Sequence, residues 1–471
     1  MGKIAHMLGL LLTHPTEFGT LVHFYLYHKA KRDITAPQEH PTSGWDRASM
    51  RRCWEFLDMT SRSFAVVIKE LEGDLARTVC MFYLVLRGLD TIEDDMTIPD
   101  AVKQPLLRSF HEKTVTPGWN FTGNGPTEKD RQLLVEYDTV VEEVNRLAPE
   151  HRQIILDITH KMGVGMADYA HRAAMTGTVH FDTITEYDLY CHYSAGLVGE
   201  GLARICSASG KEAPLLREQL ELANSMGLLL QKTNIIRDFR EDTDDERFLW
   251  PREIWGKYGF EEMKDMCEGG DVEHATWAQS GMVLDALRHA TGSLECLRLL
   301  TNQGIFVACA VPLTMAMATL TLCFMNPEVF QRSIKIRKAE AVRLVMRSTN
   351  LREVALIFRE YAREIHHKAR PQDPNFLRLS VVCGRMEQWF EQHYPSFVVL
   401  SQTGPTFDPR DKRTAIVNLE KTRLLELETK RGKPQAPQPI EMFPRMYVGG
   451  ALLRVGALSA GIIYIVLAIL G

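Results

Sequence analysis

Two acidic clusters are the residues of this 471-residue chain whose types and spacing most directly indicate chemistry. Residues 90–95 read Asp-Thr-Ile-Glu-Asp-Asp, and residues 238–242 read Asp-Phe-Arg-Glu-Asp. Each cluster contains two aspartates four residues apart, a spacing that places both side chains on one face of a helix, one turn apart. Because like charges stacked in this way destabilise a helix, the pattern predicts that a bound cation neutralises them.

Oxygen ligands define the kind of metal that these clusters suit. The predicted ligands are Asp90, Glu93, Asp94, Asp238 and Asp242. With no paired His or Cys nearby, these carboxylates favour Mg²⁺, with Mn²⁺ as a second possibility, over zinc. Mg²⁺ usually takes one or two carboxylates and completes its shell with water and phosphate oxygens. The clusters therefore predict a site for a metal ion and a diphosphate substrate.

Polar residues upstream of each cluster extend it into a stripe. The two stripes are Tyr83, Arg87, Asp90 and Asp94, and Gln231, Asn234, Asp238 and Asp242. Both lie in sequence that is otherwise apolar and helical. Since buried polar groups are unfavourable without partners, two such stripes predict a polar cavity inside the protein.

Helices must position these residues, because apolar residues recur every three to four positions along most of the chain. We predict an all-α fold with helices over roughly 45–70, 74–96, 128–147, 150–176, 184–209, 213–240, 276–301, 305–324, 337–368 and 374–393. Ala195, Gly199 and Ala203 recur at four-residue spacing, which indicates close helix packing. The predicted organisation is an apolar N-terminal segment (1–34), a catalytic domain (35–400), a polar, proline-rich linker (401–446) and an apolar C-terminal segment (447–470).

The apolar C-terminal segment is long enough to cross a bilayer and is interrupted only by Arg454. We predict that it is a C-terminal transmembrane anchor, with basic residues before it holding the preceding side in the cytosol. Residues 305–325 are also uncharged and long enough to span. Small residues and the internal Pro312 instead favour a buried helix that walls a hydrophobic pocket.

Composition further limits the partners and the cellular compartment that we expect for this protein. A net charge of −5 gives no reason to expect nucleic acid as a partner, and 45% apolar residues can form a large core. The nine cysteines form no C-x-x-C pair, so we expect reduced core thiols in a cytosolic domain.

Four motifs carry a resemblance to a known family. Residues 83–95, 190–199, 234–242 and 335–338 together resemble the squalene synthases, eukaryotic members of the head-to-head prenyl synthase group. The resemblance implies a single isoprenoid-synthase-type helical domain with a central cavity, monomeric and on the cytosolic face of the endoplasmic reticulum membrane. It also implies an enzyme of sterol biosynthesis that condenses two farnesyl diphosphates to presqualene diphosphate and reduces this product to squalene with NADPH.

The same resemblance implies roles for individual residues. The five carboxylates would hold Mg²⁺. The groups that would bind phosphate oxygens are Arg62, Arg87, Arg237, Ser61, Gln231 and Asn234. Tyr83 would bind substrate, and the wall that excludes water would comprise Phe64, Phe306, Cys309 and Pro312, with the ring of Phe306 stabilising a carbocation. Tyr190 would belong to the proton-abstracting region, and Lys335 and Arg337 would bind the phosphates of NADPH.

Other interpretations stay open at this point. Tyr190 alone is compatible with simple aromatic packing, and a short basic run such as 335–338 is typical of a solvated surface. A phytoene- or dehydrosqualene-type synthase would share both acidic clusters but not the reduction. A prenyl diphosphate hydrolase would use similar carboxylates, and a non-catalytic, membrane-tethered helical scaffold would use none of them.

Overall fold

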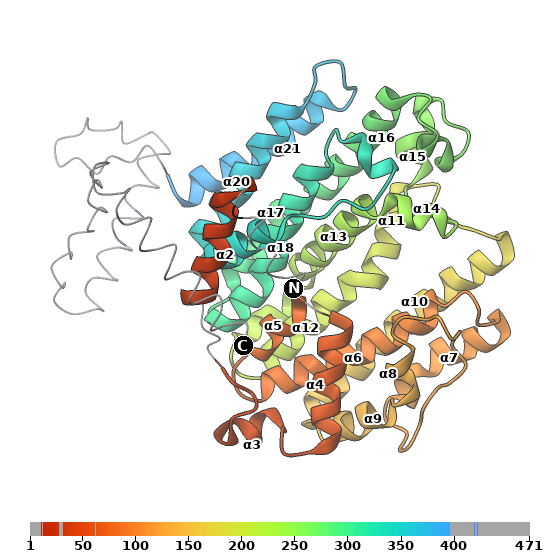
Figure 1. The fold of residues 1–471 in the computed structure, drawn as a ribbon, viewed down its shortest axis with the longest axis vertical. Helices are drawn as coiled ribbons and strands as arrows, with labels where there is room; N and C mark the ends of the chain where they lie inside the picture. The colour runs from red at the N-terminus through yellow and green to blue at the C-terminus, as the bar shows by residue number, and fades with distance from the viewer. Residues whose placement is uncertain are drawn as a thin grey trace. The chain divides into compact units, whose positions relative to one another are not determined.

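The computed structural model describes residues 11–395, except 12, 28–31 and 62, together with Leu419 and Thr422. The chain divides into two compact units, Met1–Ser396 and Phe397–Gly471. The described part of the first unit consists of helices, turns and one two-stranded ladder, which confirms the predicted all-α class (Figure 1). Apart from Leu419 and Thr422, the predicted linker and membrane anchor lie outside the described residues, as does Arg62.

The helices are mostly long and are joined by short turns. The α-helices are α2 (Pro15–Tyr27), α3 (His40–Ser43), α4 (Ala48–Ser61), α5 (Ser63–Lys69), α6 (Asp74–Asp94), α7 (Asp100–Lys113), α8 (Arg131–Val135), α9 (Asp138–Asn145), α10 (Pro149–Thr176), α11 (Ile184–Cys191), α12 (Leu197–Ala208), α13 (Leu220–Arg237), α14 (Phe239–Asp244), α15 (Arg252–Trp255), α16 (Val272–Leu287), α17 (Ala290–Leu299), α18 (Gln303–Cys323), α19 (Lys338–Arg347), α20 (Leu351–Lys368) and α21 (Phe376–His393). The remaining elements are the 3₁₀ turns η1 (Pro37–Glu39), η3 (Pro214–Glu218), η4 (Gly256–Tyr258), η5 (Met263–Cys267) and η6 (Pro327–Phe330), the π-helical turn η2 (His192–Gly196) and the strands β1 (Val179–His180) and β2 (Arg247–Phe248).

The boundaries of α10 illustrate how the sequence sets helix ends. Pro149 occupies its first position, where the missing N–H costs no hydrogen bond. Gly177 ends it in the left-handed region at φ 80°, and its N–H donates to the carbonyl of Ala173. Glycine adopts this conformation without a side-chain clash. The predicted helix over 150–176 is therefore confirmed almost to the residue.

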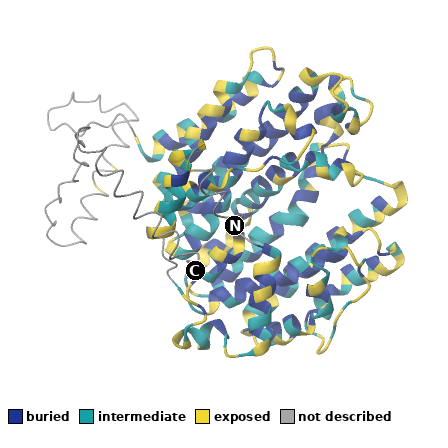
Figure 2. Ribbon diagram, viewed as in Figure 1, coloured by how far each residue is buried: buried dark blue, intermediate teal, exposed yellow. Residues whose placement is uncertain are grey.

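Helix α13 lies at the centre of the packing and contacts α12, α16, α17 and α18. In Figure 1 the orange helices α4 and α6–α9 and the green-to-blue helices α16–α21 form two groups, with α11–α13 between them. The buried apolar residues likewise form two clusters, one centred on α6 and one spanning α13 to α21. Figure 2 shows buried residues along the inner helices and exposed residues at the outer loops.

Glycines allow α12 and its preceding turn to approach α13 closely. A Cβ on Gly199 would lie 2.4 Å from the carbonyl oxygen of Ala223, and one on Gly227 would lie 2.4 Å from that of Ala195. Any side chain at either position would force the backbones apart. The close helix packing predicted from the small-residue spacing is therefore confirmed.

The structure divides four of the predicted helices, those over 45–70, 128–147, 276–301 and 337–368, into α4 and α5, α8 and α9, α16 and α17, and α19 and α20. It also differs from the prediction at α7, at Asp238 and at the two strands. Helix α7 was not expected, because Pro105 interrupts its pattern; buried Leu107 and Phe110 nevertheless hold it in place. The predicted helix over 213–240 is broken at Asp238, which has φ −98° and ψ 13°. The ladder formed by β1 and β2 is parallel and only two residues long, and it was not predicted.

Helix α18 corresponds to the uncharged stretch at 305–325. Among the described residues it is the one helix long and apolar enough to cross a membrane, yet 67% of that stretch is buried inside the protein. The Asn302 side chain caps its start by accepting a hydrogen bond from the N–H of Ile305 at 3.1 Å. The predicted buried helix is therefore confirmed.

Candidate active site

Three carboxylates at the end of α6 line a small polar pocket of about 150 Å³, here called the carboxylate pocket. The residues that line it are Asp90, Glu93, Asp94, Met166, Tyr169, Tyr190, Tyr193, Ser194, Gln231 and Arg247. Helices α6, α10, α11 and α13 and the turn η2 all contribute to this set. The structure thus brings Tyr190 and Gln231, which the sequence placed on separate helices, to the first acidic cluster.

Arg247 is the main residue of the pocket that sequence reasoning missed. Its guanidinium forms an ion pair with Asp94 at 2.8 Å and donates a hydrogen bond to the hydroxyl of Tyr190 at 3.3 Å. Its position depends on the short ladder, in which Arg247 pairs with Val179. The one available signal was a lone basic residue directly after Asp244-Asp245-Glu246, and nothing local indicated the strand pairing.

The pocket contains more acidic groups than its basic groups neutralise. Burial raises the pKa of Asp90 to about 7, with Asp94 adding to the rise and Arg87 opposing it. Burial, followed by repulsion from Asp94, raises the pKa of Glu93 to about 8. These shifts record an unfavourable concentration of negative charge, which a bound cation would relieve.

The second acidic cluster is only partly directed toward this pocket. Burial raises the pKa of Asp242 to about 7, and both Arg247 and Asp94 are close enough to influence it. Asp238 instead accepts hydrogen bonds from Arg237 Nε at 2.8 Å and from the Ser333 hydroxyl at 2.7 Å. The structure therefore brings neither Asp238 nor Arg237 into the pocket lining.

The backbone still continues helically through Asp238. Its N–H donates to the carbonyl of Asn234, and its own carbonyl accepts from the N–H of Asp242, both at 2.9 Å. The one-turn separation of the two aspartates is thus kept despite the break. No three His, Cys, Asp or Glu side chains of the described chain converge closely enough to hold a metal ion by themselves.

A larger apolar cavity of about 290 Å³ adjoins the carboxylate pocket, and Asp90 and Gln231 line both. Six further predicted site residues line this apolar cavity, namely Phe64, Tyr83, Arg87, Asn234, Cys309 and Pro312. The remainder of its wall is aliphatic or aromatic, including Phe82, Leu86 and Leu230. A substrate can therefore place a charged group among the carboxylates and an apolar chain in the cavity.

Phe306 does not line this cavity. It is 6% exposed and belongs to the core cluster on the other side of α18. Ile305, Ala308, Cys309 and Pro312 share the face of α18 that lines the cavity, as the helical repeat requires. The aromatic rings at the wall are instead those of Phe64, Phe82 and Tyr83. The ring centroids of Phe64 and Tyr83 are 6.5 Å apart.

Two predicted phosphate-binding residues carry buried polar atoms without a hydrogen-bond partner in the described chain. These atoms are Ser61 Oγ and Arg87 Nε. The nearest carboxylate oxygen to Arg87 Nε belongs to Asp130, at 3.8 Å. Because a buried unsatisfied donor is unfavourable, Arg87, which lines the apolar cavity, is suited to an incoming oxygen ligand. Ser61 lines neither the carboxylate pocket nor the apolar cavity.

The basic segment 335–338 follows the residue that contacts the second acidic cluster. Ser333, which donates to Asp238, lies two residues before Lys335. Lys335 and Arg337 are exposed, and Arg337 forms an ion pair with Glu17 of α2. Lys335 thus follows the residue that contacts the cluster by two positions in the sequence, whereas Arg337 is engaged with the N-terminal helix.

Comparisons with known proteins agree with this geometry. A sequence profile described as squalene/phytoene synthase matches residues 57–340. A squalene synthase of Ganoderma lucidum is 62% identical over 449 residues, which cover 91% of this chain and 96% of that protein. A squalene synthase of Schizosaccharomyces pombe is 50% identical over 347 residues, covering 74% of this chain and 75% of the relative. A solved structure of TcSQS with a ligand superposes with a TM-score of 0.70 at 38% identity, covering 74% of this chain and 99% of that one.

Proposed function

The chain belongs to the squalene/phytoene synthase family and, within it, groups with the squalene synthases, and from that premise we propose how its site performs the reaction. The substrate is farnesyl diphosphate, two molecules of which are condensed head to head and then reduced to squalene. The observation that carries the proposal is the junction at Asp90 and Gln231, where a carboxylate-rich pocket meets an apolar cavity. A prenyl diphosphate has the same division between a charged head and an apolar chain.

Mg²⁺ is the metal that best suits the donor set. Asp90, Glu93 and Asp94 would hold it together with diphosphate oxygens, and Asp242 would join them from the second cluster. When bound, the metal would supply positive charge that stabilises the departing pyrophosphate. The unpartnered donor of Arg87 would bind further phosphate oxygens.

Ionisation of the first farnesyl diphosphate breaks its C1–O bond and leaves an allylic cation in the apolar cavity. The C2–C3 double bond of the second molecule attacks this cation, and loss of a proton closes the cyclopropane ring of presqualene diphosphate. Walls formed by residues such as Phe64, Cys309 and Pro312 keep water from trapping the cation as an alcohol. The ring of Tyr83 stabilises the positive charge through its face.

Tyr190 and Arg247 form the proton-handling part of the site. Burial raises the pKa of the Tyr190 phenol well above its usual value, although Arg247 opposes the rise. Tyr190 therefore keeps its proton at neutral pH and acts as a relay. Its oxygen accepts the proton lost from carbon while its own proton passes to a diphosphate oxygen.

The second half-reaction ionises presqualene diphosphate, and the rearranged C30 cation is quenched in the same apolar cavity. NADPH, when bound, would supply the hydride and leave as NADP⁺. Lys335, two residues after the Ser333 that donates to Asp238, would contact a cofactor phosphate, and Arg337 would do so after releasing Glu17. The apolar lining of the cavity favours reduction over hydration, because it offers water few hydrogen-bond partners.

The product has consequences for where in the cell the reaction would take place. Squalene is insoluble in water, so an enzyme that releases it benefits from a membrane close by. The apolar segment 447–470 would anchor the chain in the endoplasmic reticulum membrane, with the catalytic unit in the cytosol as a monomer.

Product analysis tests this function directly. The full chain, purified in detergent, is incubated with farnesyl diphosphate and Mg²⁺, with and without NADPH. We expect presqualene diphosphate without NADPH and squalene with it. A C30 hydrocarbon with a central double bond in both reactions would indicate the dehydrosqualene-type alternative, and farnesol alone would indicate a hydrolase. The absence of any product from farnesyl diphosphate would contradict the proposal.

A further inference from the structure

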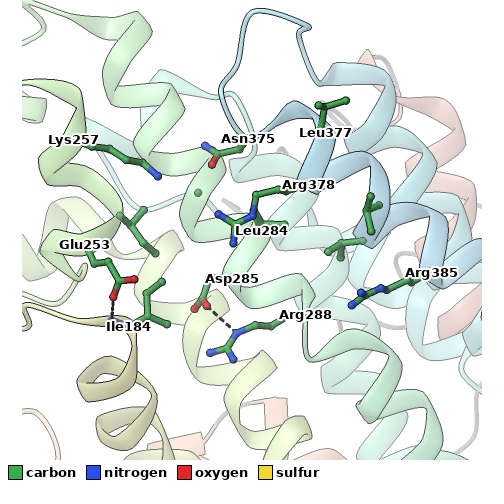
Figure 3. A pocket seen from close by; sticks show the side chains of 14 residues that line it. Ile184, Glu253, Lys257, Leu284, Asp285, Arg288, Asn375, Leu377, Arg378 and Arg385 are labelled. Carbon is green, nitrogen blue, oxygen red and sulfur yellow. Dashed lines mark hydrogen bonds and ion pairs between the residues drawn. The ribbon is translucent and has the colours of Figure 1, made fainter.

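A further groove, of about 480 Å³, is lined by parts of α15, η4, α16 and α21. It shares no lining residue with the carboxylate pocket or the apolar cavity. Four of its lining residues are basic, namely Lys257, Arg288, Arg378 and Arg385 (Figure 3). We call it the basic groove.

Three of these cations are not neutralised by the protein. Arg288 contacts both Asp188 and Asp285, its Nε donating to Asp285 at 2.8 Å. By contrast, Lys257, Arg378 and Arg385 form no ion pair within the described chain. Elsewhere on α20 and α21 arginines are paired across the helix interface, for example Arg359 with a glutamate at 3.1 Å. The basic groove therefore has positive charge that is available to a ligand.

The unpaired cations approach one another across the groove. Figure 3 shows Lys257 and Arg378 extending from opposite walls into the space between them. The Lys257 ammonium lies 5.3 Å from the centre of the Tyr258 ring. Burial raises the pKa of Tyr258, and Arg378 is near enough to oppose that rise. Both cations thus lie around one residue, whose pKa the carboxylate of Asp373 also raises.

Apolar side chains flank the cations. Leu377 is 75% exposed and Val381 is 56% exposed, and their four-residue spacing places them on one face of α21. Inside the groove, Ile184 and Leu284 add apolar surface. A ligand that fits this arrangement carries a compact anion for the cations and an apolar group for the face of α21.

We propose that the basic groove binds the phosphate group of an amphiphilic anion. Guanidinium groups match phosphate oxygens with paired N–H donors, so Arg378 and Arg385 are the main contacts and Lys257 is a further one. The apolar part of the ligand covers Leu377 and Val381. Both a soluble prenyl diphosphate and the headgroup of an anionic phospholipid have this chemistry.

The basic groove is also connected to the active site through α11. Glu253, which lines the groove, accepts a hydrogen bond from the N–H of Ile184 at 2.9 Å, where α11 begins. Arg288 contacts Asp188 in the middle of the same helix. Tyr190 lies on α11 two residues later. Occupation of the groove therefore stabilises the helix that carries the proton relay.

Hydrogen–deuterium exchange on the full chain in detergent tests the proposal, with a metal chelator present so that the carboxylates hold no cation. The probes are farnesyl diphosphate, dioctanoyl phosphatidic acid and, as a zwitterionic control, dioctanoyl phosphatidylcholine. We expect one or both anionic probes to slow exchange in 376–385 and in 184–191. The variant Arg378→Gln/Arg385→Gln should weaken this binding about tenfold or more. The matched variant Arg298→Gln/Arg352→Gln, which removes the same charge from other exposed helix positions, should bind like the parent chain.

The outcomes distinguish the two possible ligands from each other and from results that overturn the proposal. Protection by farnesyl diphosphate alone identifies a soluble prenyl diphosphate, protection by phosphatidic acid alone identifies a lipid headgroup, and either supports the proposal. Equal protection by phosphatidylcholine overturns it, because the groove would then bind apolar chains without regard to charge. Unchanged binding by Arg378→Gln/Arg385→Gln also overturns the proposal, as does the absence of protection with every probe. A melting temperature equal to that of the parent chain verifies that the variant is folded.

Discussion

Two groups of charged side chains include or adjoin residues of both α11 and α13, and they are built in opposite ways. The carboxylate pocket places Asp90, Glu93 and Asp94 together with Arg247 as its principal cation. The second group, here called the ion cluster, consists of Lys232, Arg288, Asp188 and Asp285. The pocket is left with excess negative charge, whereas the ion cluster balances two positive with two negative charges.

The pKa values reflect this difference. In the carboxylate pocket, burial dominates and raises the pKa of Asp90 and Glu93. In the ion cluster, burial alone would raise the pKa of Asp188, but Lys232 and Arg288 bring it below its ordinary value. Lys232 is fully buried, and its ammonium lies 2.5 Å from Asp188. Charge balance thus distinguishes a group that holds helices together from one that is prepared for a ligand.

The largest effect is expected from Asp90→Asn, which removes a carboxylate from the pocket at its junction with the apolar cavity. We expect kcat for squalene formation to fall by about 10⁴-fold, or ~5 kcal/mol of transition-state stabilisation. The free energy of unfolding should stay the same or rise, because the mutation relieves repulsion from Asp94. Steady-state kinetics and urea unfolding measure the two quantities. Near-normal turnover would remove Asp90 from the metal and phosphate site.

In the ion cluster, by contrast, we expect a mutation to lower the stability of the fold. Lys232→Met should lower the free energy of unfolding by about 3–5 kcal/mol, because it leaves the buried Asp285 and the half-buried Asp188 facing one arginine. The double variant Lys232→Met/Asp285→Asn restores equal numbers of charges and should recover part of that loss. Chemical unfolding of both variants tests this. A double variant less stable than the single one would show that charge balance is not what the cluster provides.

These two regions also differ in how far the sequence predicted them. Asp90 and Asp94 lie on an unbroken helix, so their four-residue spacing was enough to place both side chains correctly. At Asp238 the helix breaks, and the side chain turns to Arg237 and Ser333. A helical repeat cannot indicate which neighbour a side chain will choose once several are within reach. The position of Phe306 shows the same limit, because the neighbouring Ile305 occupies the face of α18 that lines the cavity.

Long-range contacts account for most of what was missed. Arg247 reaches the pocket through a two-residue ladder with β1, 68 positions earlier along the chain by the register of Val179 and Arg247. So short a strand has no recognisable alternation. Lys232 was a detectable anomaly, since it is a lone basic residue in an apolar stretch, but its partners come from α11 and α16. The class of each helix is a local property, whereas the pairing of charges is a property of the assembled fold.

Arg247→Gln tests what the main cation of the carboxylate pocket contributes to catalysis. Removing its main cation should raise the pKa of Asp242 further and leave the Tyr190 hydroxyl without its donor. We expect kcat to fall about 10²-fold, or ~2.7 kcal/mol, with a smaller change in KM. Arg247→Lys keeps the charge and should retain more activity than Arg247→Gln. Equal loss in both variants would mean that hydrogen-bond geometry rather than charge determines the role of Arg247.

The smallest effect is expected beside the ion cluster, at His289. Burial, followed by repulsion from Lys232 and Arg288, lowers the pKa of His289 to about 3. An unfolded chain has a histidine pKa of about 6.5, so between these values the unfolded state binds the extra proton. The free energy of unfolding should therefore decrease as pH falls through this range, by about 2 kcal/mol between pH 7 and pH 5.

His289→Gln should remove that part of the pH dependence, while His180→Gln, at an exposed position, should leave it unchanged. Urea unfolding from pH 5 to pH 7 measures the slope for each variant. The carboxylate pocket contributes in the opposite sense, because carboxyls with raised pKa values favour the folded state when protonated at lower pH. If His289→Gln keeps the full acid sensitivity, then the positive charges of the ion cluster do not lower the pKa of His289. Charge balance would in that case extend to the surroundings of the cluster as well as to its four members.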